Sequence, residues 1–384
     1  MGRRGRFIAA VFAAVALATG VPAVAAPYTN GLPASPDYFP IGVWLQQPRH
    51  ALEFQELGIN LFVGLWKGPT EDQLATLAAN HMDVAAAQND VALSSPNANV
   101  VKMWALEDEP DNAKRIEGGG FGPCVLAADV AAEAAQQKAK DPTRPVFVNF
   151  GAGVAWSGWI GRGSKCFGDM AYYDDAIKGS DILCFDIYPV ANSDARIQGK
   201  LEYVGRGVDN LVKRAAPGQT VWAIIETTML QAKQMVTPDQ LRSEVWMAII
   251  HGAKGIVYFV HEWTGGFKED GVFRHPEIVD AMMKLDASIK TLAPVINSES
   301  IPGKASVSSP AITTMVKESG GALYLFAVSN IADGQTVSFS VSGIKKGGAV
   351  VVDENRSVAI SNGTLSDSFA PYAVHIYEIP EAGR

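Results

Sequence analysis

The stretch TVWAIIETTMLQAKQMVTPDQLRSEVWMAIIHGAKGIVYFVHE, residues 220–262, predicts a strand, a helix and a second strand in succession. Residues 220–226 and 255–262 are almost wholly apolar up to their final positions, and the helix predicted between them runs from Thr237 to Gly252. Apolar strands that alternate with helices are typical of a parallel sheet that is covered on both faces. This unit therefore predicts an α/β fold.

The same alternation extends over residues 41–296 and includes eight strand candidates. Eight such units over this length predict a closed (β/α)8 barrel, or TIM barrel. An open doubly wound sheet is the alternative, but no G-x-G-x-x-G motif follows the first strand. The link at 89–99 is too short and polar for a full helix, so one unit is expected to be degenerate. The strand candidates are Ile41–Gln46, Ile59–Trp66, Met82–Gln88, Val100–Leu106, Pro145–Phe150, Asp181–Tyr188, Thr220–Glu226 and Gly255–Glu262, and the other helices are expected at Thr70–Asn80, Val125–Lys140 and Ser193–Ala216.

Beyond Pro294 the rhythm changes to short strands separated by turn signals, which predicts a small antiparallel β-sandwich. We therefore expect a signal peptide at 1–25, a catalytic barrel at 26–296 and a C-terminal β-sandwich domain at 297–384. The last domain is expected to stabilise the barrel, with sugar binding as the alternative. Its strand candidates are Ala311–Val316, Ala322–Ser329, Thr336–Val341, Ala349–Val352 and Ala373–Ile379.

The N-terminus has three arginines in residues 1–6, an apolar run at 7–20 and the small residues Ala23-Val24-Ala25. This pattern predicts a secretory signal peptide, and the apolar run is shorter than the roughly 20 residues of a membrane span. We expect a secreted or periplasmic protein without membrane insertion after cleavage. Export permits a disulfide, which we expect between Cys124 and Cys166 in Gly-rich segments, with Cys184 a buried free thiol.

The chain has 384 residues, 48% of them hydrophobic, and a formal net charge of −8. This charge disfavours nucleic acid as a partner, because the protein would repel the phosphate backbone. The six histidines and three cysteines form no zinc motif, and no G-x-S-x-G elbow or phosphate loop is present. We expect no cofactor and a monomer.

Carboxyl groups stand at the ends of two predicted strands, and in such barrels the active site lies at the carboxyl ends of the strands. The fourth strand ends in Glu107-Asp108-Glu109-Pro110-Asp111, and the seventh ends in Glu226, on the same face as Trp222 and Ile224. Pro110 is expected to hold Glu109 extended. Two facing carboxyl groups, one protonated and one ionised, are what glycoside hydrolysis requires.

Asp-Glu-Pro after strand four and Ile-Glu-Thr at the end of strand seven resemble the clan A retaining glycoside hydrolases. The resemblance implies a double displacement with Glu109 as acid/base and Glu226 as nucleophile. It also implies that Tyr188 hydrogen-bonds the nucleophile and that Trp263 lies under the reacting sugar. Asp108 departs from the Asn that is usual in this superfamily, so the contact of that residue with the sugar 2-hydroxyl is in doubt. Glu107 is an alternative acid.

Aromatic and polar residues near other strand ends are expected to line the substrate site. The candidates are Trp44, Trp66, Asn149, Trp156, Trp159 and Asp186. We therefore expect a secreted glycosidase whose substrate is an oligo- or polysaccharide. The alternatives are a carbohydrate-binding barrel without catalysis and a metal-assisted hydrolase that uses Asp108, Glu109, Asp111 and Asp186.

Overall fold

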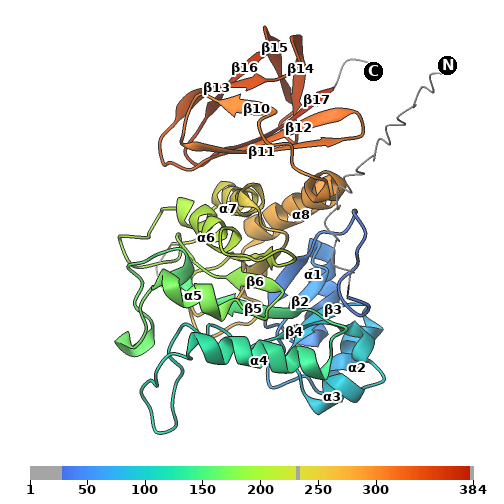
Figure 1. The fold of residues 1–384 in the computed structure, drawn as a ribbon, viewed down its shortest axis with the longest axis vertical. Helices are drawn as coiled ribbons and strands as arrows, with labels where there is room; N and C mark the ends of the chain where they lie inside the picture. The colour runs from blue at the N-terminus through green and yellow to red at the C-terminus, as the bar shows by residue number, and fades with distance from the viewer. Residues whose placement is uncertain (1–27, 231–233, 381–384) are drawn as a thin grey trace, which may run out of the picture.

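The structure, a computed structural model, describes residues 28–230 and 234–380. The signal peptide predicted at 1–25 lies outside the described residues. An α/β barrel and a β domain are stacked along the long axis of the molecule (Figure 1). Within the described residues, no helix combines the length and the apolar character that crossing a bilayer needs.

The barrel is one parallel sheet with the strand order β7-β6-β5-β4-β3-β2-β1-β9-β8. Trp222 interrupts the seventh predicted strand, which therefore forms the two pieces β7 and β8. The sheet closes because β6 pairs with β7, and Asp186, just beyond β6, bridges Ile224 of β8. The prediction of an eight-unit barrel is confirmed. The strands are β1 (Ile41–Trp44), β2 (Leu61–Val63), β3 (Asp83–Ala86), β4 (Val101–Ala105), β5 (Val146–Phe150), β6 (Ile182–Phe185), β7 (Thr220–Val221), β8 (Ala223–Glu226) and β9 (Ile256–Phe259).

Side chains that alternate along the strands fill the barrel and pack beneath the helices. The inward-facing set includes Met103, Phe147 and Trp222, and the rings of Phe147 and Trp222 meet edge to face with centroids 5.9 Å apart. The barrel interior is therefore a packed core, and a ligand must bind at one of its ends.

The helices begin largely where the sequence predicts. Thr70 and Thr237 are the N-caps of α2 and α7, and each completes a capping box with a glutamine. The short α3 confirms the degenerate unit. In contrast, α6 begins only at Glu202, and Gly199, which the prediction placed inside this helix, has a left-handed φ of 76°. The helices are α1 (Ala51–Leu57), α2 (Glu71–Ala79), α3 (Asp90–Ser94), α4 (Ala127–Lys140), α5 (Met170–Ala176), α6 (Glu202–Val212), α7 (Pro238–His251) and α8 (Pro276–Asn297).

The C-terminal part forms an antiparallel sheet in the order β10-β13-β16-β15-β14-β17-β12-β11. Phe339 of β13 packs on Tyr377 of β17 with ring centroids 5.8 Å apart, so the two halves of the sheet form a sandwich, as predicted. Strands β10, β15 and β16 were not predicted from the sequence. Strand β10 has only three residues, and β15 and β16 each have exposed residues at several positions. The strands are β10 (Ala305–Val307), β11 (Ile312–Ser319), β12 (Ala322–Ser329), β13 (Gln335–Val341), β14 (Lys346–Val351), β15 (Arg356–Ser361), β16 (Thr364–Phe369) and β17 (Val374–Pro380).

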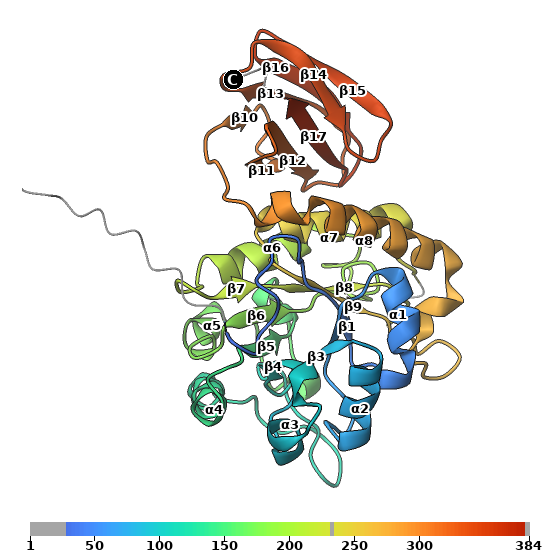
Figure 2. The ribbon, with the colours of Figure 1, turned by 90° about the vertical axis from the view of Figure 1, so that its right-hand side faces the viewer.

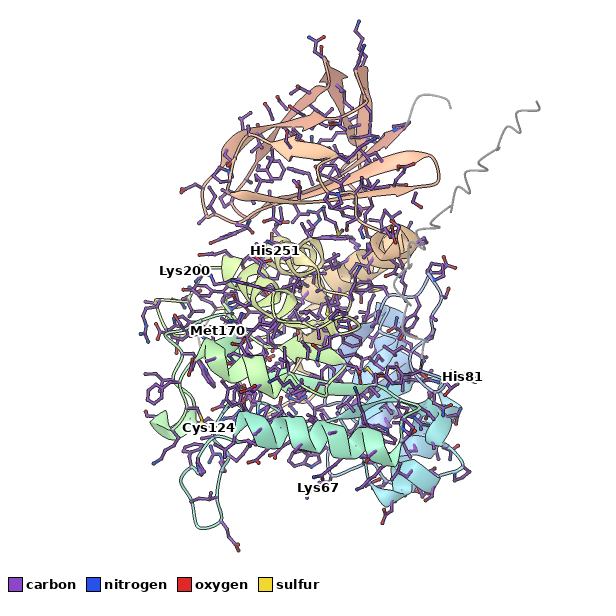
Figure 3. All side chains as sticks on the ribbon, in the orientation of Figure 1. Lys67, His81, Cys124, Met170, Lys200 and His251 are labelled. Carbon is purple, nitrogen blue, oxygen red and sulfur yellow. A yellow bond between two sulfur atoms is a disulfide. The ribbon has the colours of Figure 1, made fainter. Side chains whose placement is uncertain are left out.

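Helices α7 and α8 lie between the barrel and the β domain (Figure 2). Trp246 of α7 contacts Phe326 of β12, with ring centroids 5.9 Å apart, and both are fully buried. His251, labelled at this boundary in Figure 3, pairs with Asn330 at 3.1 Å. The two parts therefore share an apolar interface.

Candidate active site

A cavity of about 370 Å³ lies where the carboxyl ends of several barrel strands meet. It combines aromatic rings, carboxyl groups, an amide and a guanidinium, which is the mixture expected of a small-molecule site. Seven of the residues predicted for the site line it. The full set is Trp44, Asp108, Glu109, Asn149, Arg162, Asp186, Tyr188, Ile224, Leu230, Phe259 and Trp263.

Glu109 lies in the turn after β4 and has an uncommon backbone conformation. Its φ is 44°, so the expectation that Pro110 holds this residue extended is wrong. The Glu109 N–H donates to the Asn149 carbonyl at 2.9 Å, and the Asn112 N–H donates to the Glu109 carbonyl at 2.9 Å. These two hydrogen bonds fix a tight turn in which Glu109 adopts a left-handed backbone conformation. This conformation costs free energy in a residue other than glycine, and such strained residues are often found at functional sites.

The Glu109 carboxylate is held by two side chains. Asn112 donates to its Oε2 at 2.9 Å, and the Arg162 guanidinium forms an ion pair with the same oxygen. Only 13% of the Glu109 side chain is exposed. An ion pair with a guanidinium stabilises a charged carboxylate, so Glu109 is suited to act as the ionised group of this site.

Asp186, one residue beyond β6, faces the same cavity in a different environment. Burial raises the pKa of Asp186 well above its usual range, and the negative charges of Glu109 and Asp108 raise it further. Tyr188 is its hydrogen-bonding partner. Burial therefore favours the protonated form of Asp186, and its Oδ1 atom, which is also buried, has no partner among the described residues.

Asp108 is a third carboxyl group at the cavity, beside Glu109 and Asp186. Asn149 donates to its Oδ1 at 2.8 Å. Burial, followed by the charge of Glu109, raises the pKa of Asp108 to about 6. The Oδ1 atom of Asn149 is also buried without a partner in the described part of the chain. This amide oxygen can therefore accept a hydrogen bond from a ligand.

Glu226 does not line the cavity, and the prediction that it shares one with Glu109 is wrong. The residue is fully buried, and its carboxylate accepts hydrogen bonds from the N–H groups of Val190 at 2.7 Å and Ala191 at 2.6 Å. The residue of β8 that reaches the cavity is Ile224. Tyr188 lies in the cavity as predicted, but its partner is Asp186, so its predicted contact with Glu226 is also wrong.

Aromatic rings form part of the cavity wall. Trp263 is 48% exposed and stacks on Phe259, with an interplanar angle of 13° and a centroid distance of 5.9 Å. Trp44, the last residue of β1, is the other predicted tryptophan at the cavity. Such rings can pack on the C–H faces of a ligand.

Three predicted tryptophans do not line this cavity. Trp66 is exposed beside Lys67, and Trp156 stacks with the Arg196 guanidinium at 4.8 Å. Trp159 packs against the backbone of Gly151 and Gly153, close to the Glu109 side chain, but is not among the residues that line the cavity. These rings follow strand ends in the sequence, but their loops turn them towards solvent or neighbouring backbone.

Arg162 was not predicted, and it enters the site through a cross-linked loop. Cys124 and Cys166 form the predicted disulfide, with Cα atoms 5.8 Å apart, and Cys184 is the buried free thiol as expected. Figure 3 labels Cys124 near the start of α4. The Arg162 N–H donates to Asn112 Oδ1 at 2.7 Å. Both contacts bind the Arg162 loop to the loop that contains Glu109.

The metal-centre alternative finds no support in this arrangement. Asp111 is buried and accepts hydrogen bonds from the Gly151 N–H at 2.8 Å and from the Tyr173 hydroxyl at 2.7 Å. Burial raises the pKa of Asp111 to about 7. Over residues 28–230 and 234–380, no three Asp, Glu, His or Cys side chains are grouped so that they could hold a metal ion. Asp111 therefore supports the turn and does not join Asp108 and Glu109 as a ligand set.

Comparisons with known proteins bear on the fold. No protein-family model matches the sequence, and no curated protein sequence is significantly similar to it. A Bacteroides fragilis protein provisionally described as an alpha-galactosidase aligns in structure with a TM-score of 0.50 and 11% identity, over 90% of this chain and 80% of that one. A maltogenic alpha-amylase from Thermotoga neapolitana aligns with a TM-score of 0.47 and 11% identity, over 90% and 99% of the two chains. At such identity the similarity extends to the fold alone.

Proposed function

We propose that this protein is a glycoside hydrolase that cleaves O-glycosidic bonds of an oligo- or polysaccharide in the cavity around Glu109 and Asp186. One observation supports this most strongly. Two carboxyl groups line a single cavity in environments of opposite effect, since Arg162 stabilises the charge of Glu109 and burial favours the neutral form of Asp186. Such a pair divides the acid and base roles between its members.

In this proposal Asp186 is the general acid. Its raised pKa keeps a proton on the carboxyl group near neutral pH, and that proton is transferred to the oxygen of the departing sugar. Tyr188 orients the carboxyl group. Glu109, which the sequence resemblance gave the acid/base role, becomes the ionised partner.

We infer that Glu109 attacks the anomeric carbon, so that the retaining course expected from the sequence is kept with a different nucleophile. Among the neighbouring charges, that of Glu109 has the largest effect on the pKa of Asp186, as expected for two carboxyl groups that lie close together. Retaining enzymes place these groups about 5–5.5 Å apart, and inverting ones about 6.5–9.5 Å. Proton NMR of the first product anomer distinguishes the two courses.

The rest of the cavity is compatible with a sugar. Trp263 and Trp44 offer rings for the C–H faces, and the unpartnered Asn149 Oδ1 offers an acceptor for a hydroxyl. The predicted signal peptide and the Cys124–Cys166 disulfide support secretion, where polysaccharides are accessible.

A panel of aryl glycosides and of plant, fungal and bacterial polysaccharides tests the proposal. We expect sugar release from at least one member, and loss of this release in Asp186→Asn and Glu109→Gln. Binding without release across the panel would instead indicate a carbohydrate-binding barrel, and release that is unchanged in both variants would reject the assigned pair.

A further inference from the structure

Glu226 and Glu244 form a buried pair of carboxyl groups that the proposed reaction does not use. Glu226 ends β8, Glu244 lies in α7, and both have no exposed surface. Both carboxyl oxygens of Glu244 are buried and have no hydrogen-bond partner among the described residues, and the charge of Glu226 acts on this group. Burial disfavours a charge on either group, and two neighbouring buried carboxyl groups disfavour being charged together.

The same Glu226 carboxylate binds the backbone that follows β6. One of its oxygens accepts from the Val190 N–H at 2.7 Å and the other from the Ala191 N–H at 2.6 Å. Both of these residues are buried, so without Glu226 two N–H groups would lose their partner in the protein interior. Hydrogen bonds to a charged carboxylate are stronger than neutral ones.

This clamp lies next to the catalytic segment in the sequence. Asp186 and Tyr188 line the cavity, and Val190 follows after a single proline. The segment 186–191 is attached to β8 at both ends, by the bridge from Asp186 to Ile224 and by the bonds from 190–191 to Glu226. The position of Asp186 therefore depends on a residue that never reaches the cavity.

We propose that Glu226 is a positioning residue that fixes residues 190–191 and thereby holds Asp186 and Tyr188 in the cavity. The effect on catalysis rests on the proposed function, but the clamp itself does not. Glu226 supplies the oxygens that accept from the loop. Burial and the charge of Glu226 favour the protonated form of the neighbouring Glu244.

The pair also makes the clamp sensitive to pH. Burial raises the pKa of Glu226 to about 7, and burial together with the charge of Glu226 raises the pKa of Glu244 well above its usual range. Over the described residues, the facing groups are Glu244 from α7, Glu226 from β8 and only backbone N–H groups from the loop after β6. Above about pH 7 the pair therefore bears one charge, on Glu226, and loss of the Glu244 proton at more alkaline pH places two adjacent buried charges beside the clamp.

Amide hydrogen exchange of the segment around 190–191, corrected for the intrinsic pH dependence of exchange, tests this without a substrate. In the wild type we expect protection that falls at alkaline pH, above the value of about 7 at which Glu226 becomes charged, as Glu244 loses its proton. Glu244→Gln cannot lose a proton, so its protection should stay constant over this alkaline range. Glu226→Ala should reduce protection about tenfold or more at every pH. If Glu226→Ala does not fold, Glu226→Gln should expose one of the two amides, because its amide group offers only one acceptor.

Asp286→Asn is the matched control, since Asp286 is another fully buried carboxyl group, bonded to the Tyr258 hydroxyl at 2.7 Å. It should leave the protection of 190–191 unchanged. Unchanged protection in the Glu226 variants, or the same alkaline loss in Glu244→Gln as in the wild type, would overturn the proposal. A protein that releases no sugar but shows the expected exchange would overturn the proposed function and leave the clamp standing.

Discussion

Arg162 and Glu109 are joined by an ion pair, although 53 residues separate them in the chain. Arg162 belongs to the loop that Cys166 cross-links to Cys124, and Glu109 belongs to the turn after β4. Asn112 bonds to both, through its amide group to Glu109 and through its oxygen to the Arg162 N–H. The charge of the proposed nucleophile therefore depends on how two loops are held together.

Replacing Arg162 tests this dependence. Arg162→Ala removes a charge-assisted hydrogen bond of about 1.5–3 kcal/mol from Glu109, so kcat/KM should fall about 10- to 100-fold. Arg162→Lys keeps the positive charge but loses the planar guanidinium, so its kcat/KM should lie between those of Arg162→Ala and the wild type. Arg196→Ala is the control, because it removes a guanidinium that stacks on Trp156 outside the cavity. Its kcat/KM should be close to that of the wild type. Equal rates for Arg162→Ala and wild type would contradict the role of this pair.

The disulfide should contribute substantially to stability. It closes a loop with a sequence separation of 42 residues, for which chain entropy predicts about 4 kcal/mol. The double variant Cys124→Ser/Cys166→Ser should therefore unfold at clearly lower denaturant concentration, as measured by fluorescence. Thiol titration of the unfolded, unreduced wild type should find one free group, Cys184, whereas three free groups would show that the bridge does not form.

Asp286 should make stability fall as pH rises. Burial raises the pKa of Asp286 to about 8, so the folded state keeps a proton that the unfolded state loses near pH 4. Its contribution is full below about pH 4 and is lost as the pH rises through 8. Asp286→Asn cannot lose this proton, so its free energy of unfolding should decline less than that of the wild type between pH 5 and 9. Parallel curves for the two proteins would contradict this reading.

The fold could be predicted from the sequence because its decisive signals are local. Runs such as residues 182–185 are apolar throughout, and Thr70 and Thr237 mark helix starts by hydrogen bonds to residues three positions away. The strands of the β domain with alternating exposed polar residues gave too little hydrophobic contrast to be found. The start of α6 was predicted too early, because residues 193–201 resemble a helix in composition although Gly199 among them has a left-handed φ.

The site could be predicted in part. Asp108, Glu109 and Asp186 line one cavity, as the strand-end rule leads one to expect, because the carboxyl ends of barrel strands converge. The rule failed at Glu226, because the backbone N–H groups of residues 190–191 donate hydrogen bonds to its carboxylate. Backbone donors of this kind leave no pattern of side chains in the sequence. The sequence also contains Glu244 directly before the apolar run 245–250, and this carboxyl group is fully buried in α7.

The leaving-group dependence of hydrolysis tests the central assignment most directly. Asp186→Asn cannot protonate the departing oxygen, so its rate of hydrolysis should fall about 10²- to 10⁴-fold on substrates with poor leaving groups. The rate should fall far less on dinitrophenyl glycosides, whose leaving group needs no proton. Glu226→Gln should slow both classes of substrate by a similar factor. If the selective loss appeared in Glu226→Gln while Asp186→Asn hydrolysed both classes normally, Asp186 would not be the acid.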